Sequence, residues 1–337
     1  MSAPPETRTD PLRARHHHTP QHYLRRWAAE TDERVWVHRS DWPDPKPINV
    51  VNVGVEKHLY SLVDPQPNVP ADVLERGLSD MIDGPASALI PRLIAGDALS
   101  ADDRLLFAQH LYLQHARSPW MKREGMRLFA QSHEFALDGF LKSAKAREEL
   151  IDLAPEEIRG LARELIEARG LKIEVSADLW VVTIIQQLFE TDIPTRIAAL
   201  PWRLIETKTG TFVTSDLPVV NARVADHARN AIRRGWYSDA FETVYPLGPT
   251  HVLLIRAGQP TMPGLATAQW RKDVNRRMIG AALREVYAYQ PRPEIMQSIG
   301  QLTARGLRFE TMDMPDRSRL LHYEMPEISG LAFREGG

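Results

Sequence analysis

The sequence contains no cysteine among its 337 residues. This absence excludes a disulfide framework, a thiolate zinc site, an iron–sulfur cluster and a cysteine nucleophile. A chain without thiols also fits a reducing compartment, and we expect a cytoplasmic location.

Long apolar runs are missing as well. No stretch approaches the roughly 18 residues that a membrane helix requires, so we expect no membrane partner. The first segment, MSAPPETRTDPLRAR, lacks the apolar centre of a signal peptide. Residues 1–14 are polar and contain three prolines, which predicts a disordered tail.

A strong net charge is also absent. The formal charge is -2, so no global field attracts nucleic acid or anionic lipid, and the 43% of hydrophobic residues is ordinary for a globular protein. Basic residues gather locally instead. If the first two clusters face one cleft, they would attract a phosphate-bearing ligand; each cluster alone is more typical of a solvated helix face. The clusters are Arg13, Arg15, Arg25 and Arg26; Lys122, Arg123 and Arg127; Arg229, Arg233 and Arg234; and Arg271, Lys272, Arg276 and Arg277.

What the chain does contain is a dense group of histidines in RHHHTPQHYLRRW, residues 15–27. Thr19 predicts a helix N-cap, and Pro20 suits the first helical position because its missing N–H costs nothing there. We expect a helix from about residue 20 to residue 29. Its buried face would carry Tyr23, Leu24 and Trp27, which are spaced three and four apart.

The order of the predicted elements favours an α+β fold, with a largely helical middle and a mixed or antiparallel sheet built from N-terminal and C-terminal strands. We expect a single domain over residues 15–314 and a loosely ordered tail over 315–337. The patterns predict strands at 34–39 and 48–55, a hairpin at 202–216 and two strands within 241–258. They predict further helices at 71–82, 85–95, 101–117, 119–145, 155–169, 177–199 and 268–288.

Several separated motifs resemble the domain-of-unknown-function 4238 family when they are taken in order. That family has a His-x-x-Pro-Gln-x-Tyr-Leu opening, a Tyr-Ser pair, a helix that ends in Arg-Thr/Ser-Pro, and a late Ser-Asp-x-Pro-Val turn. The resemblance covers residues 16–290 and implies a fold and key positions but no established chemistry. His22 stands where the family favours an aromatic residue. The matching parts are His17 or His18 with Pro20, Gln21, Tyr23 and Leu24; Tyr60-Ser61; Arg117-Ser118-Pro119; and Ser215-Asp216-Leu217-Pro218-Val219.

The opening histidines have three interpretations. His18 and His22 are four residues apart, the spacing that places two imidazoles on one helix face for a metal. His18 precedes the expected cap, however, and no acidic residue accompanies the pair as in a helical zinc site. The ring nitrogens could instead serve acid–base chemistry or contact a phosphate, or the histidines could only cap, pack or face solvent.

Asp216 follows the apolar residues Phe212 and Val213 and precedes Leu217-Pro218. A carboxylate at such a strand end could hold a metal, orient a histidine or accept a proton. It could equally form an Asx-turn with the backbone that follows, because Asp-x-Pro is a turn signal. Ser215 lacks the Gly-x-Ser-x-Gly elbow of a nucleophile.

His110, Gln114 and Arg117 lie four and then three residues apart, so one helix stripe presents three polar groups. Arg117 lies at the expected C-terminus of that helix, where a positive charge is favourable in any case. Its guanidinium fork also suits two-point binding of a carboxylate or phosphate.

These residues predict a cytoplasmic hydrolase that acts on a phosphate-containing substrate or nucleic acid in a His/Arg/Asp cleft. The alternative is a protein that binds an anion or nucleic acid and breaks no bond, and a third interpretation is purely structural. The cofactor is a divalent metal if there is one, and the oligomeric state is open. The candidates are His17, His18 and Asp216 as catalytic residues; Gln21, Tyr23, Arg117 and Ser215 for substrate; and His18 and Asp216 for a metal.

Overall fold

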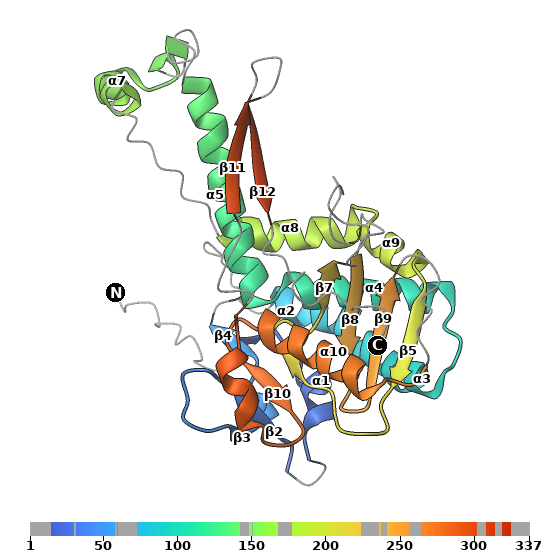
Figure 1. Cartoon of the computed structure of the whole chain (residues 1–337). Coiled ribbons are helices and arrows are strands. Elements are labelled where there is room, and N and C mark those ends of the chain that lie inside the picture. The colour runs from blue at the N-terminus through green and yellow to red at the C-terminus, as the bar shows by residue number, and fades with distance from the viewer. Residues whose placement is uncertain are drawn as a thin grey trace, which may run out of the picture.

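The computed structural model describes residues 15–29, 32–57, 59, 73–141, 148–149, 151–167, 177–223, 236, 241–256, 264–301, 308–313 and 319–324. These residues form an α+β fold with antiparallel sheets (Figure 1). The strands are β1 Arg15–His17, β2 Arg34–His38, β3 Lys46–Asn49, β4 Val55–Lys57, β5 Trp202–Glu206, β6 Thr214–Ser215, β7 Val220–Arg223, β8 Phe241–Pro246, β9 His251–Arg256, β10 Val286–Ala288, β11 Arg308–Asp313 and β12 Arg319–Glu324. The helices are α1 Gln21–Leu24, α2 Val73–Leu78, α3 Gly84–Ala95, α4 Ala101–Ala116, α5 Pro119–Leu141, α7 Arg159–Glu167, α8 Ala177–Phe189, α9 Ile193–Ala199 and α10 Ala268–Ala281.

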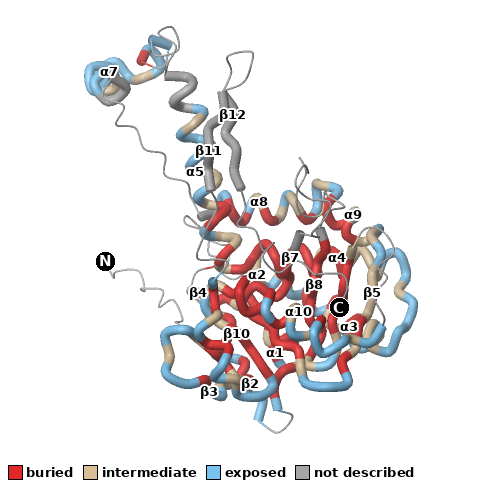
Figure 2. Tube along the Cα trace, viewed as in Figure 1, coloured by how far each residue is buried: buried red, intermediate tan, exposed pale blue. Residues whose placement is uncertain are grey.

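The four-stranded sheet β5-β9-β8-β7 is covered on both faces. Alternate residues of β9 join different cores: Leu253 belongs to the core shared with α4, whereas Leu254 belongs to the core shared with α10. This double cover explains why HVLLIR is apolar without alternation, since both faces of the strand are buried. Figure 2 shows buried residues through this central part of the molecule.

A second sheet, in the order β3-β2-β10-β6, combines two strands from the N-terminal part of the chain with two from its C-terminal half. β10 pairs with β2 and with β6, both antiparallel. A two-stranded sheet of β1 and β4 carries the histidines of the opening motif, with His16 opposite Glu56 and His17 opposite Val55. This pairing joins the opening motif to a strand that lies later in the chain.

The predicted hairpin at 202–216 is wrong. β5 pairs with β9, whereas β6 pairs with β10 in the other sheet. The backbone between them turns to other partners, because the N–H of Thr207 donates to the carbonyl of Thr250 and the N–H of Phe212 donates to that of Pro249. The side chain of Asn275 on α10 then binds the backbone on either side of Phe212.

The predicted helix at 268–288 ends early, at Ala281, and Val286–Ala288 forms strand β10 instead. The N–H groups of Leu283, Arg284 and Glu285 are bound by the Asp216 carboxylate, which leads the chain out of the helix. The predicted helix at 177–199 is two helices, α8 and α9, and the second begins beside Pro194.

Three further segments complete the comparison with the sequence. The stretch predicted as one strand at 48–55 divides into the end of β3, a 3-10 turn at Val50–Asn52 and the start of β4. Strand β12 falls inside the segment 315–337 that we expected to be loosely ordered, where it pairs with β11. No helix in the described part of the chain is long and apolar enough to cross a membrane.

Candidate functional site

The opening motif begins a helix, but not through Thr19. The N-cap position belongs to Pro20, which provides no side-chain cap, and its carbonyl accepts the N–H groups of Tyr23 and Leu24. The Thr19 hydroxyl is buried and lies 3.0 Å from His18 Nδ1. The predicted threonine cap is therefore wrong, because this hydroxyl bonds to its neighbouring imidazole instead.

A cavity of about 330 Å³ opens beside this helix, and we call it the Arg117 cavity. Three residues predicted for the site line it, His17, Gln21 and Arg117, so tertiary structure brings together positions about 100 residues apart. The remaining lining residues are Pro20, His22, Arg25, Glu75, Arg76, Leu78, Ser79 and Asp83.

The carboxylate partner of Arg117 is Asp83. Arg117 Nη1 donates to Asp83 Oδ2 at 2.6 Å and Nη2 donates to Oδ1 at 3.1 Å, a two-point ion pair with both residues buried. Burial alone would raise the pKa of Asp83, but the Arg117 charge and the His110 hydrogen bond outweigh it and hold this pKa below its ordinary value. The guanidinium fork that we predicted to clamp a substrate is thus filled by a carboxylate of the protein.

A π-helix, Ser79–Asp83, delivers Asp83 to the cavity. Such turns interrupt regular α-helices and are frequent at functional sites. Nothing in the local sequence marked Asp83, and its nearest signal is the Gly84-Pro85 helix start that follows. Its role depends on α4, which supplies its partners from 27 and 34 residues away.

A buried hydrogen-bond network continues from Asp83 into the core. His110 Nδ1 lies 2.9 Å from Asp83 Oδ1, and its Nε2 lies 3.1 Å from the Tyr245 hydroxyl. The Tyr245 ring stacks on Tyr23 at a centroid distance of 5.1 Å. Gln114 also donates to Asp83, so the predicted polar stripe on α4 is an internal one.

Tyr23, which we predicted to contact substrate, lies in the core and is not among the lining residues of the Arg117 cavity. Its side chain is fully buried, and its hydroxyl donates to the carbonyl of Pro246 at 2.8 Å and lies 2.7 Å from Thr214 Oγ1. The tyrosine therefore ties the opening helix to both sheets.

His17 lies at the rim of the cavity. Its backbone N–H donates to Glu75 Oε1 at 3.0 Å, and the amide of Gln21 donates to its Nε2 at 3.3 Å. The buried ring of His16 lies 3.8 Å from the same carboxylate. Glu75 therefore fastens the β1 end of the motif to α2.

His18 is buried, with 4% of its surface exposed. Burial, then the charges of Arg117 and His17, lower the pKa of His18 to about 3. This imidazole is neutral at physiological pH and lies behind the cavity wall.

His22 is the site residue that the sequence interpretation missed. It lines the Arg117 cavity and also an adjoining cavity of about 750 Å³ that contains Arg26 and His251. Its ring lies 6.1 Å from that of His110. Its Nε2 is buried and has no hydrogen-bond partner among the described residues. The spacing to His18 marked it as a possible metal ligand, but the departure from the family pattern argued against a role, and the candidate residues did not include it.

Asp216 and Ser215 anchor the backbone. Asp216 Oδ1 accepts the N–H of Leu283 at 2.8 Å, and Oδ2 accepts those of Arg284 and Glu285 at 2.7 and 3.0 Å. Asp216 is not among the lining residues of the Arg117 cavity, where Asp83 is the carboxylate beside Arg117, and the Asx-turn with the following residues is replaced by bonds to a distant segment. Ser215 Oγ shapes the turn, because it binds both the N–H and the carbonyl of Leu217.

Within the part of the chain that the structure describes, no group of three or more His, Cys, Asp or Glu side chains is arranged to hold a metal ion. The predicted metal ligands differ in surroundings, because His18 contacts Thr19 and Asp216 binds three backbone N–H groups. The Tyr60-Ser61 pair and the basic cluster at 229–234 lie outside the described residues. In the second basic cluster, Lys122 pairs with Glu56.

Comparison with known proteins gives one match. The model of a family described as a protein of unknown function, DUF4238, matches residues 15–291. No curated protein and no solved structure gives a significant match. Because the matched segment spans most of the chain, as the resemblance predicted, this protein belongs to the DUF4238 family.

Proposed function

We propose that this protein hydrolyses a phosphate ester in the Arg117 cavity, with His22 as the general base. The observation that carries the proposal is the buried Nε2 of His22, which lines the cavity and has no partner among the described residues. Buried polar atoms almost always find a partner, so an unpaired one at a cavity wall is suited to meet a water or ligand.

The surroundings of His22 keep its ring neutral, so that one ring nitrogen carries a lone pair. Burial, followed by His110, lowers its pKa to about 4, Asp83 opposes the shift, and Arg117 and Arg25 add to it. The ring is therefore neutral near pH 7. A bound phosphate would raise this pKa through its negative charge, which strengthens the base when substrate is present.

In the reaction, the His22 ring would act first as a general base and then as a general acid. His22 takes a proton from water as the water oxygen bonds to phosphorus and the ester P–O bond breaks. The imidazolium then returns the proton to the leaving oxygen. Arg25 and Arg76 line the cavity and would stabilise the charge on the phosphoryl oxygens. The Asp83–Arg117 pair, bound to α4, would hold the wall in place.

The substrate that this arrangement suits is a phosphomonoester or a phosphodiester, including the backbone of a nucleic acid. We propose a cytoplasmic location for the activity, supported by the composition of the chain. A second candidate function is anion binding without cleavage. One observation favours it: Glu75 and Asp83, the carboxylates among the described lining residues, are both held by protein partners.

Purified protein should hydrolyse p-nitrophenyl phosphate or bis-p-nitrophenyl phosphate, and His22→Gln should lower kcat about 100-fold or more. His133→Gln, which changes an exposed histidine on α5, is the matched control and should retain activity. Equal rates for the two variants would refute the role of His22. If no rate is found while phosphate binding weakens in Arg25→Gln, the binding function replaces the hydrolase.

A further inference from the structure

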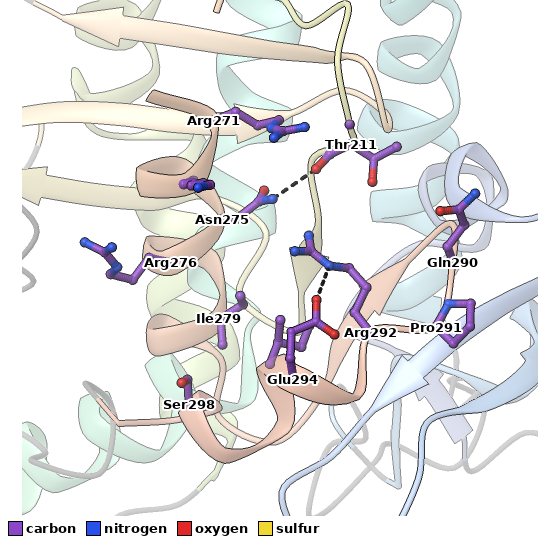
Figure 3. A pocket seen from close by; sticks show the side chains of 13 residues that line it. Thr211, Arg271, Asn275, Arg276, Ile279, Gln290, Pro291, Arg292, Glu294 and Ser298 are labelled. Carbon is purple, nitrogen blue, oxygen red and sulfur yellow. Dashed lines mark hydrogen bonds and ion pairs between the residues drawn. The ribbon is translucent and has the colours of Figure 1, made fainter. Parts of the chain in front are cut away.

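A second cavity, of about 560 Å³, lies between α10 and the segment 290–298, and we call it the α10 cavity. Thr211, from the loop before β6, closes one end (Figure 3). None of its lining residues belongs to the Arg117 cavity. The site is therefore separate from the one proposed for hydrolysis.

The walls of the α10 cavity are strongly basic. Arg271, Lys272 and Arg276 come from α10, and Arg292 enters from the opposite wall. Glu294 is the one carboxylate among the described lining residues, and it is already paired with Arg292 at 3.0 Å. Positive charge in this amount on a chain of net charge -2 marks a local anion-attracting surface.

The charges of α10 are differently engaged. Arg276 lies 3.4 Å from Asp273, one turn away on the same helix. Among the described residues, no carboxylate lies within ion-pair distance of Lys272. Arg277, which the sequence grouped with them, instead points into the core and pairs with the buried Glu242. Folding thus separates Arg277 from Arg271, Lys272 and Arg276, which are the members of this basic cluster that line the cavity.

The guanidinium of Arg271 lies against the loop at residues 209–210. It donates to the carbonyl of Thr209 and lies against Gly210, where a Cβ atom would overlap Nη1. Gly210 adopts φ +71°, a backbone conformation that glycine tolerates best. Arg271 Nε is buried and has no hydrogen-bond partner among the described residues. Arg271 is therefore a positive charge positioned by the backbone of Thr209, and its Nε–H has no acceptor among the described residues.

The other walls are also held. Asn275 accepts the N–H of Val213 at 3.0 Å and donates to the carbonyl of Thr211 at 2.9 Å. Across the cavity, the N–H of Arg292 donates to His38 Nε2 at 2.8 Å. Such preorganised walls lower the entropic cost of binding.

We propose that the α10 cavity binds a compact small molecule that carries two or more phosphate groups. Cations line both walls of the cavity, and Arg271 and Lys272 have no carboxylate within ion-pair distance among the described residues, so a ligand with separate phosphate groups could meet both walls; guanidinium forks also suit phosphate oxygens. The described lining residues include no aromatic side chain on which a base could stack. The cavity therefore recognises charge rather than bases, which favours a small polyphosphate over single-stranded nucleic acid.

The test is titration calorimetry of the full chain with inorganic tripolyphosphate. The double variant Lys272→Gln/Arg276→Gln should raise Kd at least about tenfold. The control Arg163→Gln/Arg196→Gln removes the same charge from α7 and α9, away from the cavity, and should leave Kd within about twofold. If Kd rises equally in both double variants, tripolyphosphate is bound by non-specific charge attraction, and the proposal is overturned.

A second variant keeps the test decisive even if the double variant fails to fold. Ser298→Asp adds a negative charge to the cavity wall and removes no cation, so it should weaken tripolyphosphate binding in a protein that melts like the wild type. Unchanged binding in Ser298→Asp, or no binding by the wild-type chain, would refute the site. An oligonucleotide that binds more tightly than tripolyphosphate and displaces it would assign the cavity to nucleic acid and overturn the small-ligand proposal. These binding assays are independent of His22 and of the hydrolysis assay.

Discussion

Replacement of Asp83 by asparagine would test the buried pair that closes the Arg117 cavity. The change keeps the size of the side chain but removes the charge that faces Arg117, whose side chain is only 4% exposed. It removes the counter-charge that Asp83 supplies to that buried guanidinium and replaces one of two accepting oxygens with an amide donor. Breaking a buried pair from one side costs about 3–5 kcal/mol, a large part of a typical stability of about 5–15 kcal/mol.

The assay is urea unfolding at pH 7, followed by circular dichroism. Asp80→Asn, an exposed position on the same π-helix, is the matched control and should change the free energy of unfolding by less than about 0.5 kcal/mol. Adding Arg117→Met to Asp83→Asn should cost less than the sum of the single changes, because methionine leaves no buried charge. The reasoning is refuted if Asp83→Asn and Asp80→Asn unfold with equal free energies.

Two further predictions concern buried groups near the ends of the site. Asp216→Asn should destabilise the fold by about 1–3 kcal/mol in urea unfolding, because a carboxamide offers one acceptor oxygen to three backbone N–H groups. The control is Asp44→Asn at an exposed position, and equal stability of the two variants would contradict the anchoring role of Asp216. The pKa of His18 is lowered to about 3, so the unfolded chain takes up its proton first as the pH falls. Stability should therefore decline from about pH 6.5 to about pH 3, by at most ~1.4 kcal/mol per pH unit for this group, and His18→Gln should flatten that slope; a slope that does not change would place the ring in solvent.

The sequence by itself determined the elements whose signals are local. Leu24 and Trp27 lie on the buried face that their spacing predicts, and α4 begins and ends within one residue of its predicted limits. The strands β8 and β9 lie within the segment 241–258 where two strands were predicted, and they pair with each other. In each case neighbouring residues supply the information, because helical and strand periodicity depend only on the chain nearby.

Tertiary structure decided which of these elements meet and what the polar residues do. Strand β6 leaves its expected partner for β10, and α10 stops where a carboxylate 67 residues earlier in the chain binds the backbone. In the site, the sequence identified His17, Gln21 and Arg117 as candidates that share one cavity but gave the carboxylate role to Asp216.

The structure places Asp83, and not Asp216, against Arg117, because the two members of an ion pair meet through the folded structure. Nothing in the residues around Asp83 encodes a partner 34 positions away, or the burial that makes the pair costly to break. The protonation of His18 and His22 follows the same rule, since their pKa values depend on burial and on charges brought close by folding.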